Sequence, residues 1–392
     1  MNIFLEILMI IGIVIASLIA LLFIFMLVFW LIKRSSFGKN TYNPDLNGKI
    51  ILVTGGNSGI GKETARKFFE LGAKVIITGR SEKKCREFLK ELQMRPGFSN
   101  PAFYQVDFSD LNRVKEFADK IKNDFERLDI LVNNAGCFMG TYNTSRQGVE
   151  LTMAVNHLSP VYLTWLLTPL LNNSPEPRVI NVSSTAHLHF RSKFKNFIDD
   201  DFWLNKPEVD YEKEYHFTTA YGMSKMGNVL FSRGLRDWVL KTASEDEEEK
   251  KTSQDSAGGI GKLFTASLHP GDVKTNIARD AENMFIFKLM KPILACAYCL
   301  IFKNEVQGAQ TSLYLSLAPL AKLQSGEYND DCKLVKDIGE EFVQKYTPVC
   351  WNETVRLLRK LTGEEVFPTK GKVYEEFDST ATPLDTLLAD ES

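Results

Sequence analysis

The chain has 392 residues, with 47 lysines and arginines against 49 aspartates and glutamates, so its formal net charge is −2. This balance argues against a nucleic-acid partner, because proteins that bind nucleic acid generally carry a strong basic surplus or stripe. Apolar residues make up 44% of the chain and aromatic residues 11%. That content supplies a hydrophobic core and excludes a wholly disordered chain.

Six cysteines are scattered along the chain, too few and too far apart to predict a disulfide framework, and reduced thiols are expected. Cys296 and Cys299 form a C-x-x-C pair, but the pair lies in an apolar stretch and has no second ligand pair. The sequence therefore predicts no metal site.

A long apolar segment near the start of the chain predicts a transmembrane helix. Residues 7–32 contain no charge, and as a helix they would be about 39 Å long, enough to cross the hydrocarbon core with some tilt. A cleaved secretory signal would be shorter and would start with basic residues, whereas Glu6 is the only charge before this segment. Lys33, Arg34 and Lys39 follow it, which predicts that the rest of the chain lies on the cytosolic side.

Composition divides the chain into four parts. Residues 1–34 are the expected membrane anchor with its basic flank, 35–48 a short linker, and 49–366 the folded domain. Residues 367–392 form a polar, acidic tail. Within the domain, 244–259 is rich in acidic and small polar residues that cannot bury a core, so a solvated surface insertion is expected there, with a docking site as the alternative.

Short apolar runs alternate with helical patterns across the domain. Residues 49–54 read as a buried strand that stops at glycines, 62–71 carry apolar residues at helical spacing, and 74–78 read as a second strand. Further strands are expected at 102–106, 130–132, 178–182 and 263–268, and further helices at 114–125, 151–171 and from Tyr221 onward. This alternation predicts an α/β fold with a doubly wound parallel sheet of the Rossmann type.

Residues 284–302 form a second apolar stretch, rich in Met, Phe, Leu and Ile. Lys288, Lys291 and Pro292 interrupt it, so a second membrane span is not expected. Two interpretations stay open for this stretch. One is an amphipathic helix over a lipophilic pocket or at the membrane face, and the other is an ordinary core helix.

A glycine-rich turn follows the first predicted strand, with glycines spaced G-x-x-x-G-x-G before a predicted helix. Such glycines allow a tight turn that brings backbone N–H groups against a pyrophosphate at the helix N-terminus. Because the turn lies inside a βαβ unit, it predicts dinucleotide binding. The expected contacts are Gly55, Asn57, Ser58, Gly59, Ile60 and Gly61.

The residue after the second predicted strand bears on the choice of cofactor. An NAD-binding protein usually has an acidic residue there for the adenosine ribose, but this chain has Arg80 in the run Thr78-Gly79-Arg80-Ser81. An arginine can pair with a ribose 2′-phosphate through its planar donors, so NADP(H) is favoured over NAD(H). An ordinary surface arginine is the alternative.

These motifs, in this order, resemble the short-chain dehydrogenase/reductase family, and within it the membrane-anchored retinol-dehydrogenase-like branch, over residues 46–365. Besides the glycine turn, the resemblance rests on Asp107, the run Asn133-Asn134-Ala135-Gly136, Asn156 in Val155-Asn156-His157, Ser184 in Val182-Ser183-Ser184, Tyr221 and Lys225 in a Y-x-x-x-K pattern, and His269-Pro270-Gly271. It implies that Asp107 contacts the adenine, although a strand-end cap is the alternative. It also implies that Asn134, Ala135 and Gly136 line the cofactor cleft, and that Pro270, Gly271, Val273 and Thr275 lie along the nicotinamide carboxamide. Tyr221 and Lys225 are expected to contact the cofactor as well.

The resemblance makes Tyr221 the acid and base of a hydride-transfer reaction, which needs a proton at the carbonyl oxygen. A free tyrosine titrates near ~10, too high to release its proton readily. Lys225 lies four residues later, so on a helix the two side chains share a face. The positive charge of Lys225, with that of an oxidised nicotinamide, is expected to lower the pKa of Tyr221.

Two further residues complete the predicted catalytic set. Ser184, the second serine after its strand, is expected to hold the substrate oxygen against Tyr221, and the resemblance implies that Asn156 holds a water that links Lys225 to solvent. A serine hydrolase with His187 or His189 as base is rejected, because there is no G-x-S-x-G elbow.

The predicted function is that of an NADP(H)-dependent oxidoreductase that interconverts a lipophilic alcohol and its aldehyde or ketone, of the retinoid, steroid or fatty aldehyde class. The expected location is the endoplasmic reticulum membrane, crossed once by residues 7–32, with the catalytic domain in the cytosol. The stretch 185–220 is longer than such proteins usually have there and would lie beside the substrate entrance. The alternative is a non-catalytic nucleotide-binding subunit of a membrane complex, and a homodimer stays open.

Overall fold

The structure is a computed structural model. It describes parts of residues 7–28 and the ranges 37–94, 101–193, 215–250, 262–273, 302–336, 338–368 and 373–374. Several predictions concern residues outside these ranges: the basic residues Lys33 and Arg34, the site residue Thr275, the segments 194–214, 251–259 and 284–301, and most of the tail.

An eight-stranded sheet forms the centre of the domain, in the order β3-β2-β1-β4-β5-β6-β7-β8. Its strands are β1 (Ile50–Val53), β2 (Lys74–Gly79), β3 (Ala102–Gln105), β4 (Ile130–Asn133), β5 (Arg178–Val182), β6 (Phe264–His269), β7 (Tyr328–Asp330) and β8 (Lys333–Leu334). Neighbouring strands are parallel from β3 to β7, and only β8 is antiparallel to its neighbour. The predicted doubly wound parallel sheet is therefore confirmed, and its strand order reverses between β1 and β4, where such folds bind ligands.

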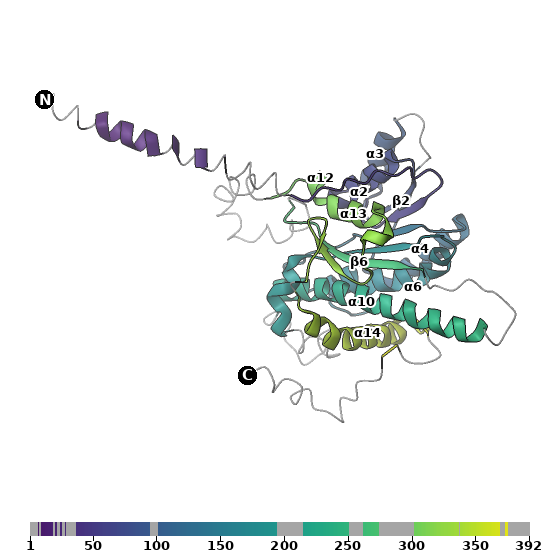
Figure 1. Ribbon diagram of the computed structural model, residues 1–392. Helices are drawn as coiled ribbons and strands as arrows, with labels where there is room; N and C mark the ends of the chain where they lie inside the picture. The colour runs from purple at the N-terminus through teal and green to yellow at the C-terminus, as the bar shows by residue number, and fades with distance from the viewer. Residues whose placement is uncertain are drawn as a thin grey trace.

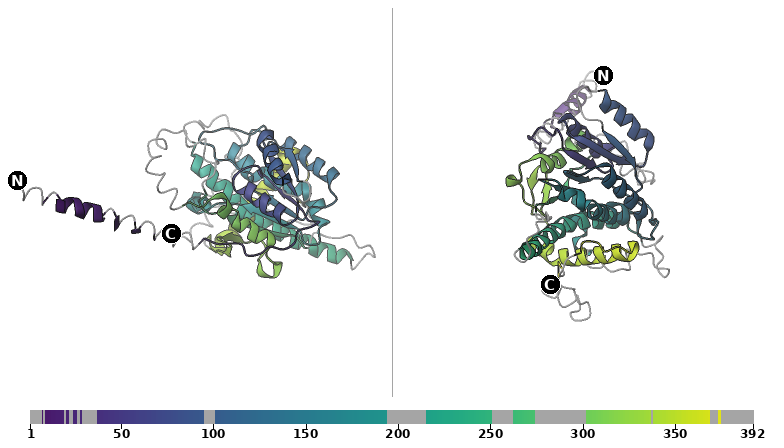
Figure 2. Two further views of the ribbon diagram at one scale, coloured as in Figure 1. Left: turned by 90° about the horizontal axis from the view of Figure 1, so that it is seen from above. Right: turned by 90° about the vertical axis from the view of Figure 1, so that its right-hand side faces the viewer.

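Helices cover both faces of this sheet (Figures 1 and 2). The main ones are α2 (Gly59–Glu70), α3 (Glu82–Gln93), α4 (Leu111–Asp124), α6 (Ser159–Asn172), α10 (Phe217–Lys250), α12 (Glu305–Gly308), α13 (Gln310–Leu317) and α14 (Glu340–Thr362). Successive strand residues point to opposite faces, so Ile51 and Val53 pack with α2, α3 and α13, whereas Leu52 packs with α4, α6, α10 and α14.

Polar side chains connect the sheet to α10. Asn133 on β4 donates from Nδ2 to Oδ1 of Asn181 on β5 at 2.9 Å, and Asn181 donates to Oγ of Ser232 on α10 at 2.9 Å. All three residues are buried, where an unpaired amide or hydroxyl would be costly. These bonds fix where α10 lies against the carboxyl half of the sheet.

Two predicted helices differ from the expectation. The helix expected at 151–171 consists of α5 (Leu151–Met153), a π-helical turn at Ala154–Leu158 and then α6. Helix α10 begins at Phe217, before the expected start at Tyr221, and continues through Lys250, so the first part of the acidic segment 244–259 is helical. The solvated surface insertion expected at 244–259 stays a prediction.

The described residues between 7 and 28 are helical, and their large apolar side chains are exposed, with Ile13 at 59% and Phe25 at 68%. This helix, purple in Figure 1, lies apart from the domain. Within the described parts of the chain, no helix has both the length and the apolar character needed to cross a membrane.

The predicted linker is packed on the domain over its described part, residues 37–48. The backbone N–H of Asn40 donates to Oε1 of Gln310 on α13 at 3.1 Å, and the ring of Tyr42 lies 6.1 Å from that of Tyr314. Leu46 is buried, and its N–H donates to the carbonyl of Leu71 at 2.8 Å.

Candidate active site

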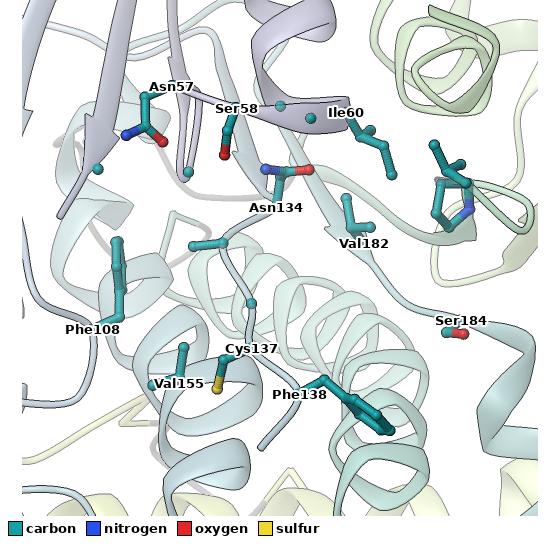
Figure 3. A pocket seen from close by; sticks show the side chains of 18 of the residues that line it. Asn57, Ser58, Ile60, Phe108, Asn134, Cys137, Phe138, Val155, Val182 and Ser184 are labelled. Atoms are coloured by element: carbon teal, nitrogen blue, oxygen red, sulfur yellow. The ribbon is translucent and has the colours of Figure 1, made fainter. Parts of the chain in front are cut away.

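A cleft of about 700 Å³ lies at the carboxyl ends of the strands, lined by the residues that follow β1 to β6. This is the edge where open α/β sheets bind ligands, and the volume is typical of cofactor sites. In Figure 3, Asn57, Ser58 and Ile60 line one side of the pocket, and Cys137, Phe138 and Val155 line the other. Among the described residues, every predicted site residue lines the cleft except Asn156.

The glycine turn has the geometry that its spacing predicted. Gly55 and Gly59 have φ of +64° and +57°, a region that favours glycine. A Cβ at Gly61 would lie 2.3 Å from Nδ2 of Asn134 and 2.6 Å from the carbonyl oxygen of Gly55, so only glycine allows this close packing. Helix α2 starts here, and Ser58 makes no side-chain cap, which leaves N–H groups available to an anion.

Thr54 joins the glycine turn to the turn that follows β4, a role that the sequence analysis did not assign. Its Oγ1 accepts hydrogen bonds from the N–H groups of Asn134 and Ala135, both at 2.9 Å. The Asn134 amide donates back to the Thr54 carbonyl at 2.8 Å. A hydroxyl at the strand end, just before a glycine turn, is the sequence signal that could have indicated this.

One end of the cleft is formed by residues that follow β2 and β3. Arg80 and Lys84 line it with exposed side chains, and Lys84 is a second cation that the sequence analysis did not name. Asp107 also lines the cleft, while its Oδ1 accepts from the N–H and hydroxyl of Ser109 at 3.0 and 2.8 Å. The strand-end turn proposed as an alternative for Asp107 is therefore present, and the carboxylate still faces the cleft.

Helix α10 carries Tyr221 and Lys225 to the other end of the cleft. The Lys225 ammonium lies 5.6 Å from the centre of the Tyr221 ring and donates to the carbonyl of Val182, at the end of β5, at 3.0 Å. The Phe138 ring meets the Tyr221 ring edge-on, 4.9 Å between centres. The three side chains therefore lie together beside the strand end that carries Ser184.

Burial controls the ionisation of both groups. Burial raises the pKa of Tyr221 to about 12, against a smaller lowering by its hydrogen bond with Ser184. Burial also lowers the pKa of Lys225 to about 8. The expectation that Lys225, together with an oxidised nicotinamide, lowers the pKa of Tyr221 concerns the complex with the cofactor and stays a prediction. In this structure burial is the main influence on the phenol, and the Lys225 ammonium is directed to the Val182 carbonyl.

The two serines after β5 have different environments. Ser183 is buried and donates its hydroxyl to the carbonyl of Lys225 at 2.7 Å, which holds α10 against β5. Ser184 faces the cleft (Figure 3), and its hydroxyl lies close enough to Tyr221 to lower the pKa of the phenol. His187 is buried against the Tyr328 ring at 4.8 Å and does not line the cleft.

Asn156 lies behind the cleft in the π-helical turn Ala154–Leu158, a rare geometry that is frequent at functional sites. Its Oδ1 accepts from the N–H of Cys137 at 2.8 Å, and its Nδ2 donates to the Cys137 carbonyl at 2.9 Å and to Ser224 Oγ at 3.0 Å. Ser224 in turn donates to the Tyr221 carbonyl at 2.7 Å. Asn156 thus connects the turn after β4 to the helix turn that carries Tyr221.

Comparisons with known proteins agree with this arrangement. A short chain dehydrogenase family model matches residues 49–195. Retinol dehydrogenase 12 of Mus musculus is 32% identical over 322 residues, which cover 82% of this chain and 90% of that protein. Retinol dehydrogenase 14 of Homo sapiens is 32% identical over 317 residues, which cover 76% and 84%.

Solved structures share the fold. A protein from Mycobacterium paratuberculosis is 24% identical, with a TM-score of 0.54 over 85% of this chain and 100% of that one. A short chain dehydrogenase from Shigella flexneri, complexed with NADP, is 21% identical, with a TM-score of 0.50 over 74% of this chain and 100% of that one. The retinol dehydrogenases cover most of both sequences, so this chain belongs to the short-chain dehydrogenase/reductase family, in its retinol-dehydrogenase-like branch, and is an oxidoreductase that acts on CH–OH donors.

Proposed function

We propose that this protein is a membrane-anchored, NADP(H)-dependent oxidoreductase that interconverts a lipophilic alcohol and its aldehyde or ketone. The observation that carries the proposal is the meeting of Tyr221, Ser184 and Lys225 in a cleft whose opposite end is a glycine turn with a helix N-terminus. Retinoids, steroids and fatty aldehydes form the substrate class.

The described residues fit a nicotinamide dinucleotide. Gly55 has a positive φ and Gly61 leaves no room for a side chain, so the backbone of the turn can approach a pyrophosphate closely. Arg80 and Lys84 are exposed at the cleft wall after β2, where they can pair with a ribose 2′-phosphate. When bound, such a cofactor supplies the hydride in reduction and accepts it in oxidation.

The remaining chemistry belongs to side chains of this chain. With its pKa raised to about 12, Tyr221 is protonated at neutral pH and can donate a proton to a carbonyl oxygen in reduction. Ser184 orients that oxygen by a second hydrogen bond. Lys225, with a pKa lowered to about 8, is mostly protonated at pH 7 and lies close enough to stabilise the phenolate that Tyr221 becomes.

Asn156 has a positioning role in this proposal. Its amide bonds both the backbone of Cys137 and Ser224, so it holds the helix turn of Tyr221 at a set distance from the cleft wall. The water between Lys225 and solvent that the family resemblance implies would act beside this network.

The apolar character of the substrate follows from the side chains around Tyr221. Phe138 contacts both Tyr221 and Phe217 edge-on, with ring centres 4.9 and 5.3 Å apart, and Met139 and Leu151 also line the cleft. The exposed apolar side chains of residues 7–28 support an anchor in the endoplasmic reticulum membrane, where such substrates concentrate.

The test is turnover by the purified full chain with NADPH and a panel of apolar aldehydes and ketones. Tyr221→Phe should lower kcat by at least ~100-fold, the usual contribution of a general acid, and leave NADPH binding intact. Tyr42→Phe is the matched control and should change nothing, because Tyr42 packs against Tyr314 and does not line the cleft. NADPH binding without turnover across the whole panel would support the non-catalytic nucleotide-binding subunit instead.

A further inference from the structure

Lys303 is a buried lysine with no part in the chemistry described above. It is 4% exposed, its ammonium pairs with the Asp331 carboxylate, and it donates to the carbonyl of Pro270 at 3.4 Å. The Asp331 side chain is 39% exposed, and an ion pair with one exposed partner is weak evidence for net stability. The role of Lys303 is therefore inferred from the three chain segments that it contacts.

The first of these segments is the loop 270–273, whose residues line the cleft. The Lys303 N–H donates to the Asp272 carbonyl at 2.8 Å, and Lys303 pairs with Val273 in a parallel bridge. Gly271 has φ of +87°, and a Cβ there would lie 2.6 Å from Nζ of Lys303. One side of the loop faces the cleft, and the other side rests on Lys303.

The same loop adjoins the catalytic end of the cleft. It follows β6, which pairs in parallel with β5, the strand before Ser184. The N–H of Thr185 donates to Nδ1 of His269, immediately before the loop, at 3.3 Å. A shift of the loop would therefore change the space beside Ser184 and Tyr221.

The second segment is the turn between β7 and β8. Asp331 and Cys332 have φ of 47° and 59°, the pattern of a type I′ hairpin turn, which normally selects asparagine and glycine. Such backbone strain persists where surrounding contacts over-determine it. The Asp331 side chain is held by Lys303.

The third segment is the chain that follows the apolar N-terminal segment. The Phe37 ring centre lies 5.3 Å from the Lys303 ammonium. Gly38 lies directly against the turn, since a Cβ there would be 2.0 Å from the Asp331 carbonyl oxygen. The chain therefore enters the domain at the back of the loop 270–273.

We propose that Lys303 is a positioning residue that fixes the loop 270–273 at the catalytic end of the cleft and fastens it to the entry segment 37–38. Lys303 does not touch the reacting atoms. It acts on the nicotinamide half of the dinucleotide through the loop, while Arg80 and Lys84 at the other end are independent of it. This inference rests on the proposed function, because it assumes that the cleft holds NADP(H).

The test compares two probes by titration calorimetry with the full chain in detergent. NADPH contains the nicotinamide, whereas 2′,5′-ADP contains only the adenosine half. Lys303→Met should raise the Kd of NADPH by at least ~10-fold and leave the Kd of 2′,5′-ADP within ~2-fold. Lys303→Arg, which keeps the charge, should recover most of the NADPH affinity.

Gly38→Ala is a second test variant, which replaces Lys303→Met if that variant does not fold. The added methyl displaces the turn at Asp331 with Lys303 still present, so NADPH binding should weaken while 2′,5′-ADP binding is unchanged. Lys322→Met is the matched control, because this exposed lysine contacts Tyr42 of the same entry chain away from the loop. It should leave both probes unchanged.

Two results would overturn the positioning role: NADPH affinity unchanged in both Lys303→Met and Gly38→Ala, or equal weakening of the two probes. Failure of the proposed function gives a different result, because the unmodified chain would then bind neither probe.

Discussion

At the residue scale, desolvation decides the protonation of the side chains around the proposed reaction. Tyr221 and Lys225 lie four residues apart on one helix, close enough for their charges to interact. Burial nevertheless raises the pKa of the phenol to about 12 and lowers that of the ammonium to about 8. The charged form of this buried lysine therefore lowers the stability of the fold. Such a loss of stability is common at residues that serve activity.

Replacing that lysine should stabilise the fold at neutral pH. Because the pKa of Lys225 is about 8 when folded and 10.5 as a free side chain, the unfolded chain binds more protons between these values, and stability from this group rises with pH there. Below pH 8 Lys225 is charged in both states, so the full free-energy cost of burying its ammonium lowers the stability of the fold. Lys225→Met should therefore raise the free energy of unfolding at pH 7 by about 1–3 kcal/mol, while turnover is lost.

Urea unfolding of the wild type and of Lys225→Met at pH 7 and pH 10.5 measures this difference. The advantage of the variant should shrink between the two, because at the higher pH Lys225 is deprotonated in the folded wild type and about half protonated in the unfolded chain, so that its charge is no longer buried. A variant that is less stable than the wild type at pH 7 would contradict the assignment.

Cofactor preference is a second residue-scale prediction. Arg80→Ala removes a guanidinium that can form charge-assisted bonds with a 2′-phosphate, so the Kd of NADPH should rise about 10-fold or more while that of NADH changes little. Arg86→Ala is the control, because Arg86 is an exposed arginine on helix α3, which follows Arg80, and pairs with Glu82. Equal loss for the two cofactors would remove the basis for NADP(H) preference.

At the element scale, the site depends on how tightly neighbouring elements approach each other. Helix α2 contacts the turn after β4 through Gly61, and Thr54 and Asn134 bond across the same gap. The π-helical turn before α6 brings Asn156 to the other end of that turn, at Cys137. The turn after β4 is thus fixed at one end by its contacts with Thr54 and Gly61 and at the other end by Asn156.

Enlarging Gly61 tests this close approach. In Gly61→Ala the new methyl would overlap Asn134 and the Gly55 carbonyl, so the two turns must separate and the helix N-terminus must move. NADPH affinity should fall at least ~10-fold, and the free energy of unfolding should fall by about 1–3 kcal/mol from overpacking. Lys67→Ala, on the partly exposed side of α2, should leave both quantities unchanged.

At the scale of the whole molecule, the entry of the chain and the cleft are close together. Residues 37–48 pack along α13, and residues 37–38 lie behind the loop 270–273. A membrane anchor in residues 7–32 would therefore join the domain near the catalytic end of the cleft. Under the proposed function, a lipid-dissolved substrate enters the cleft at this end.

The anchor is tested by fractionation of cells that express the protein. The full chain should remain with membranes after an alkaline carbonate wash, and a variant that lacks residues 1–36 should pass into the supernatant, because burying about 20 apolar residues is what holds a spanning helix in lipid. A truncated protein that resists the wash equally well would contradict an anchor in this segment.

Sequence alone was sufficient for the six parallel strands from β1 to β6 and for the glycine turn, because apolar runs, helical spacing and glycine placement are local features. It did not predict β7 and β8, because these strands have three and two residues. So few residues show no alternation of apolar and polar side chains. Helices α3, α13 and α14 were likewise not predicted from the sequence.

The order of the motifs along the chain indicated which residues line the cleft. Only the tertiary structure decided how these residues behave. The pKa of Tyr221 depends on the groups that exclude water from it, and the different environments of Ser183 and Ser184 depend on a helix more than 30 residues away. The support of the loop 270–273 by Lys303, Asp331 and Gly38 joins segments nearly 300 residues apart. Burial and contact between distant segments exist only after the chain has folded, so no local pattern in the sequence encodes them.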